Sequence, residues 1–113
     1  MNEYDKAKTV IASLEEASPQ LLAELAESGR LGRKLSERVD AFNLQLVRKV
    51  GADPSNAVYL AAEDSLMPML TEFPISRERR PLTSEQRAKV EEQLDQWFES
   101  LPPSKLPAET SRE

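Results

Sequence analysis

The chain has 113 residues with a formal net charge of −5, is 39% hydrophobic and 31% charged, and contains neither cysteine nor histidine. We expect one globular domain, and the two missing residue types exclude disulfides, thiolate chemistry, the usual zinc sites and histidine general-base catalysis. The acidic N-terminal sequence does not resemble a signal peptide, and no apolar run reaches membrane-spanning length. We therefore expect a cytoplasmic protein without membrane contact.

Two amphipathic helices are predicted first, over residues 3–17 and 19–28. In the first, apolar residues recur every three or four positions, and Lys6 lies largely off that face. Ser18 is a favourable N-cap for the second helix. Gly29 follows that helix as a suitable stop.

The longest predicted helix covers residues 32–50, and the other elements are organised around it. Six apolar residues step by three or four and share one face of this helix: Leu31, Leu35, Val39, Phe42, Leu46 and Val50. Leu44 faces away from this stripe, which favours either a helix sandwiched between neighbours or self-association as a homodimer. A single exposed leucine would also need no explanation. Residues 30–50 carry six basic and two acidic residues, whereas the segments on either side are acidic.

A fourth helix is predicted to begin at Asp53 and Pro54. Pro68 should kink or split it near Ser65, because proline lacks an amide hydrogen and opposes a carbonyl of the preceding turn. An exposed basic linker then follows over residues 74–81.

Thr83 or Ser84 is predicted to cap the last helix, and Thr83 has capping-box spacing to Gln86. The proline-rich residues 102–113 should form an extended or disordered tail after a single helical domain of residues 1–101. We thus predict an all-α fold, a compact bundle of about five helices around the long central one. The predicted core consists of Ile11, Leu14, Leu25, Leu35, Val39, Phe42, Leu46, Leu60, Leu94 and Trp97.

Two basic clusters and one apolar segment supply the candidate partner-binding residues. These are Arg30, Arg33, Lys34, Arg38, Met67, Met69, Phe73, Arg77, Arg79 and Arg80. The helical cluster either pairs internally with carboxylates such as Glu24 and Glu27 or binds an anionic partner. The methionine and phenylalanine residues are either core, which we favour, or an adaptable docking surface. The linker arginines either keep the connector solvated or contact phosphate or carboxylate groups.

These features favour a small non-enzymatic adaptor or regulator that binds another protein, of the kind found among bacterial and phage accessory proteins. A nucleic-acid-binding protein that uses the basic helix 30–50 is the alternative, although this helix is longer than an ordinary recognition helix and the chain is acidic. A carboxylate-only enzyme is a further alternative, but neighbouring carboxylates on one helix point to different sides. We expect no catalytic residue, metal or cofactor.

Overall fold

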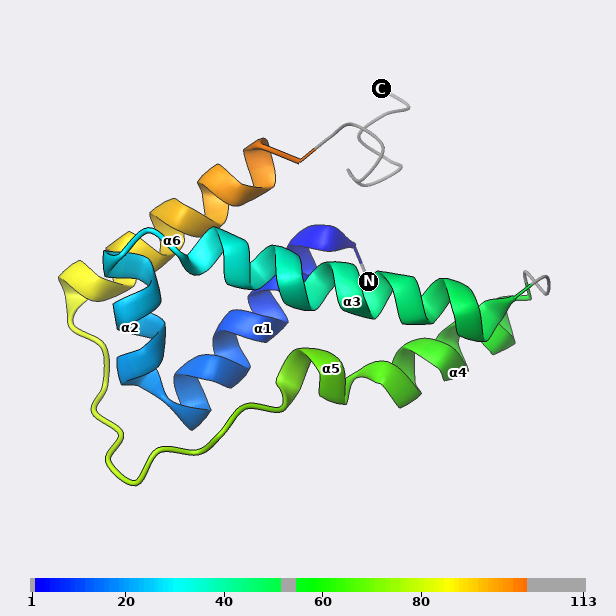
Figure 1. Ribbon diagram of the computed structural model, residues 1–113, viewed down its shortest axis with the longest axis horizontal. Coiled ribbons are helices and arrows are strands. Elements are labelled where there is room, and N and C mark those ends of the chain that lie inside the picture. Colours follow the sequence, from blue (N-terminus) through cyan, green and yellow to red (C-terminus); the bar gives the residue numbers. More distant parts are fainter. Residues whose placement is uncertain (1, 52–54, 102–113) are drawn as a thin grey trace.

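The computed structural model describes residues 2–51 and 55–101, which form α-helices and no strand (Figure 1). The helices are α1 (Glu3–Ala17), α2 (Pro19–Glu27), α3 (Leu31–Val50), α4 (Asn56–Leu66), α5 (Pro68–Thr71) and α6 (Ser84–Glu99). The predicted all-α fold with a long central helix is confirmed. The predicted tail, residues 102–113, lies outside the described residues.

Helix α3 is central because it contacts each of the other helices. Four residues of its apolar stripe, Leu31, Leu35, Val39 and Phe42, are 0% exposed, and Leu46 is 5% exposed. In Figure 1, α6 lies on one side of α3 and α4 with α5 on the other, while α1 passes behind.

The molecule is flat, measuring 44 × 34 × 17 Å. Its thickness accommodates two layers of helices, since packed helix axes lie about 8–10 Å apart. The C-terminal half of α3 and α4 extend together beyond the other helices (Figure 1). This part of the molecule therefore has fewer neighbours to cover its outer sides.

Pro68 splits the fourth predicted helix into α4 and α5, as expected. The break falls at Met67, two residues after the predicted position, because Ser65 continues the helical hydrogen bonding of α4. Helix α4 is capped by the Ser55 side chain. The predicted start at residues 53–54 lies outside the described residues.

Most of the predicted core is buried: Leu14, Leu25, Leu35, Val39, Phe42, Leu46, Leu94 and Trp97. Ile11 is partly buried against this core. The prediction for Leu60 was wrong, since this side chain is 57% exposed on the projecting α4. The prediction for Lys6 was also wrong. It is only 4% exposed, because Glu3 and Asn43 accept hydrogen bonds from its amine inside the fold.

The predicted capping box of α6 is present. The Gln86 N–H donates to Thr83 Oγ1 at 3.1 Å, and the Thr83 N–H donates to Gln86 Oε1 at 3.0 Å. At the other end of α6, the indole N–H of the buried Trp97 donates to the Ser36 hydroxyl on α3 at 2.8 Å. Helix α6 is thus fixed at both ends, by its own cap and by α3.

Helix α2 ends in a Schellman motif around Gly29, whose φ is +76°. The Gly29 N–H donates to the Ala26 carbonyl at 3.2 Å, and the Arg30 N–H donates to the Leu25 carbonyl at 2.9 Å. This turn directs the chain from α2 into α3 and therefore sets where α3 begins.

We predict that Gly29→Ala lowers the free energy of unfolding by about 1–2 kcal/mol, because a Cβ disfavours left-handed backbone. Gly32→Ala is the matched control, since a Cβ at Gly32 would lie 3.8 Å from Trp97 Cδ1, an ordinary contact. Gly32→Ala should therefore not lower the free energy of unfolding. Urea denaturation followed by circular dichroism measures both, and equal stability of Gly29→Ala and the wild type would contradict the prediction.

Candidate functional site

An extended segment, residues 72–83, connects α5 to α6 and passes the corner between α1 and α2 (Figure 1). The Ser76 N–H donates to the Ala17 carbonyl at 2.9 Å, and the Ser18 and Ser76 hydroxyls lie 2.6 Å apart. The Ser18 side chain makes no capping hydrogen bond to α2, although Ser18 holds the predicted N-cap position. Its hydroxyl instead ties the corner to the extended segment.

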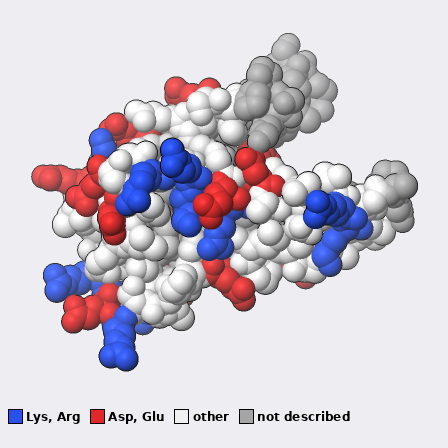
Figure 2. All heavy atoms as spheres, viewed as in Figure 1, with Lys and Arg blue, Asp and Glu red and all other residues white. Residues whose placement is uncertain are grey.

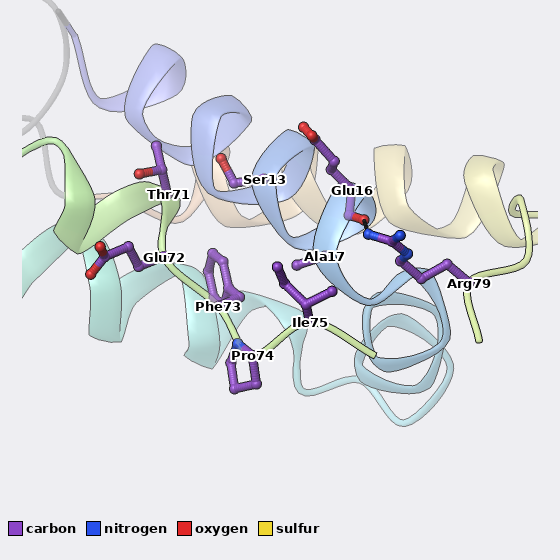
Figure 3. Close-up of a pocket in the computed structure, with 9 residues that line it drawn as sticks. All are labelled: Ser13, Glu16, Ala17, Thr71, Glu72, Phe73, Pro74, Ile75 and Arg79. Atoms are coloured by element: carbon purple, nitrogen blue, oxygen red, sulfur yellow. Dashed lines mark hydrogen bonds between the residues drawn. The ribbon is translucent and has the colours of Figure 1, made fainter. Parts of the chain in front are cut away.

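An open groove of about 680 Å³ lies between the C-terminal part of α1 and this segment (Figure 3). Its lining comprises Ser13, Glu16, Ala17, Thr71, Glu72, Phe73, Pro74, Ile75 and Arg79. Figure 3 shows the Phe73 and Ile75 side chains extending from the segment toward α1. Glu16 and Arg79 lie toward one end of the groove, and Thr71 and Glu72 lie toward the other.

Apart from Ser13, the middle of the groove is apolar, and its ends are polar. Ala17 is buried, Phe73 is half-buried, and Ile75 is 72% exposed. An apolar hollow flanked by a few polar groups is the usual composition of a ligand site. The arrangement suits an apolar side chain in the centre with polar contacts at the ends.

Arg38 on α3 fixes one part of this groove. Its Nη1 donates to the Met69 and Glu72 carbonyls, each at 3.1 Å. The centre of its guanidinium lies 4.2 Å from the centroid of the Phe73 ring. Arg38, a candidate for contact with a partner, is thus engaged inside the molecule, where it holds the end of α5 and orients Phe73.

The other basic residues near the start of α3 are interspersed with acidic ones (Figure 2). Arg30 lies 3.6 Å from Glu24, as the internal-pairing alternative expected, and Lys34 lies 3.4 Å from Glu37. Arg33 is exposed. Because these pairs are largely solvated, each contributes only about 0–1 kcal/mol to stability.

The apolar candidates Met67 and Met69 are partly buried against the core, which agrees with the favoured interpretation. Arg77, Arg79 and Arg80 are exposed on the extended segment. Of the ten candidate residues, the groove brings together Phe73 and Arg79. The remaining candidates lie on other parts of the surface or inside the fold.

The side chains of Arg79 and Arg80 make long contacts with nearby groups. Arg79 Nη1 lies 3.5 Å from the Glu16 carbonyl, and Arg80 lies 3.7 Å from Glu78. These contacts are compatible with the solvated-connector alternative. Only Arg79 also borders the groove, so it is the linker arginine placed to meet a bound segment.

A polar cluster between α1 and α3 was missed by the sequence reasoning. The Lys6 amine donates to Glu3 Oε1 at 2.9 Å and to Asn43 Oδ1 at 2.6 Å, and it lies 5.3 Å from the centroid of the Phe42 ring. The Asn43 amide donates to Glu3 Oε2 at 2.9 Å. These contacts satisfy the buried charge, so the cluster locks α1 onto α3.

Beside this cluster lies an apolar hollow of about 370 Å³, lined by Lys6, Asn43, Leu46, Val47, Val50, Gly51 and Tyr59. Burial raises the pKa of the Tyr59 hydroxyl above its ordinary value. The negative charge of Glu63, the hydrogen bond from Tyr59 to Glu63, and the charge of Glu3 raise it further. The fold therefore favours the neutral phenol at this position.

We predict that the protein loses stability in alkaline solution as Tyr59 is forced to ionise. A group whose pKa is raised by folding stabilises fully below its unfolded pKa of about 10 and loses this contribution as pH rises through the folded value. Above about pH 10, the free energy of unfolding should fall more steeply in the wild type than in Tyr59→Phe. Identical slopes in denaturation series would refute this role, since the lysines titrate in both proteins.

Compared with models of protein families, with curated proteins and with solved structures, the chain matches none. Within the described residues, no group of three or more acidic side chains is placed to hold a metal ion, and no helix has the length and apolar character to cross a membrane.

Proposed function

We propose that the protein is a small non-enzymatic adaptor or regulator whose groove binds an extended segment of another protein. The observation that supports this proposal is the exposure of Ile75, which is 72% accessible beside the half-buried Phe73. Contiguous exposed apolar surface next to a hollow is typical of interaction sites, whereas isolated exposed apolar residues are common. The predicted homodimer concerns a different surface, the outer face of α3.

The groove indicates the chemistry of the segment it binds. Its volume of about 680 Å³ accommodates one or two large side chains. Glu16 lies at one end of the groove and Glu72 at the other, and both carboxylates are exposed. The bound segment should therefore present an aliphatic or aromatic side chain with a lysine or arginine close to it in sequence, toward the Glu72 end, because Arg79 accompanies Glu16 at the other end.

The walls of the groove are held before any partner arrives. The Ser76–Ala17 hydrogen bond fixes the segment against α1, and the stacking of Arg38 fixes Phe73. A preformed site loses less conformational entropy when it binds. This favours recognition of a short peptide by a small domain.

Nucleic-acid binding by the basic stretch is less well supported. Arg38 donates to backbone carbonyls within the fold, and Arg30 and Lys34 each lie close to a carboxylate. Three of the six basic residues in this stretch thus already lie against groups of the protein itself. Retardation of duplex DNA at low salt that disappears on charge reversal of Arg33 would favour this alternative over the adaptor.

We predict that the wild-type chain enriches a common apolar-plus-basic motif from a displayed peptide library. Ile75→Ser should weaken binding of the enriched peptide by about tenfold or more, because it removes the exposed aliphatic contact. Val47→Ser is the matched control, since Val47 is 69% exposed on α3 and does not line the groove. Fluorescence anisotropy of a labelled peptide measures the affinities.

The proposal fails if no motif is enriched, or if Ile75→Ser and Val47→Ser bind the peptide equally well. Circular dichroism on both variants checks that each remains helical. The expected cytoplasmic location stays a part of the proposal and is tested by imaging a tagged chain in its host.

A further inference from the structure

The outward face of α3 carries a row of residues at four-residue intervals: Asp40, Leu44 and Arg48. All three are exposed, and Leu44 is 52% accessible. Val47 beside this row is 69% accessible, so α3 exposes two large aliphatic side chains close together. Figure 2 shows that an uncharged area separates the basic side chains over the first half of α3 from those near its C-terminal end.

This row is complementary to itself when it is reversed. Asp40 lies four residues before Leu44, and Arg48 lies four residues after it. If two copies of α3 run antiparallel about a two-fold axis at Leu44, each leucine meets its own copy. The same operation places each Asp40 opposite the other chain's Arg48, so two ion pairs flank one apolar contact.

We propose that the protein forms a homodimer in which the outer faces of two α3 helices pack antiparallel about Leu44. A second copy fits this face by its charges: an acid, an apolar residue and a base in one line match the same line reversed. Asp40 also interacts with a group of its own chain. A carboxylate has several acceptor positions, so it can accept a donor from each chain.

The small area of this face limits the affinity of the dimer. Stable interfaces of standard size bury about 800 Å² on each partner. The outer face of a single helix offers less, even with Val47 included. We therefore expect a reversible dimer with a dissociation constant in the micromolar range rather than a permanent one.

Sedimentation of the full chain over about 1–200 µM tests the proposal. The mean mass should rise with concentration from 12.7 kDa toward twice that value and no further. Leu44→Asp should raise the dissociation constant by about tenfold or more, because it places two carboxylates at the axis. A wild type that stays monomeric, a dimer indifferent to Leu44→Asp, or open-ended association would each overturn it.

Charge reversal supplies the sharper test. Asp40→Arg alone brings like charges together at both ends of the interface, and so does Arg48→Asp alone, so each variant should be monomeric. An equimolar mixture of the two should dimerise, since every facing pair is then of opposite sign. Failure of the mixture to associate, with both variants folded by circular dichroism, would overturn the antiparallel arrangement.

The dimer and the peptide groove are tested independently, because none of the residues that line the groove belongs to α3. Ile75→Ser should leave the sedimentation behaviour unchanged, whereas Val47→Ser should weaken the dimer and leave peptide affinity unchanged. If Ile75→Ser abolished dimerisation, the assignment of the interface to α3 would be wrong.

Discussion

Burial of the apolar stripe of α3 is the interaction on which the rest of the structure depends. Its side chains from Leu31 to Leu46 are at most 5% exposed, and full burial of each large aliphatic or aromatic one contributes about 1.5–3 kcal/mol. The whole free energy of unfolding of a domain is only about 5–15 kcal/mol. Because every other helix packs against α3, the positions of α1 and α5, and hence the two sides of the groove, follow from this burial.

Arg38 shows how α3 shapes the groove although no residue of α3 lines it. It lies at the edge of the buried stripe, where its guanidinium bonds the end of α5 and stacks on Phe73. A basic residue that looks available for an anionic partner in the sequence is thereby used to shape an apolar site. The arginine is suited to this because its planar group can donate hydrogen bonds and stack at the same time.

The sequence predicted those features that depend on neighbours in the chain. The stripe of α3, the break at Pro68 and the Thr83–Gln86 capping box all follow local rules. The burial of Lys6 does not follow such a rule. Lys6 lies four residues before the buried Val10 and so on the same side of α1, but its charge can be buried only because α3 supplies some of the hydrogen-bond acceptors.

Other features depend on how distant elements meet. Leu60 looked like core, yet its exposure depends on how many helices cover α4. The side of the groove is held by the hydrogen bond from Ser76 to Ala17, and no local pattern links residues so far apart. The flat shape has the same origin, because α3 is covered along its apolar stripe while its outer face, with Leu44, remains exposed.

A dimer formed about that face would leave both grooves accessible, since their lining comes from α1 and residues 71–79. Two weak sites on one particle raise the effective affinity for a partner with two copies of a segment, provided that both can be reached together. The adaptor function and the self-association of α3 would then reinforce each other, although neither surface is part of the other.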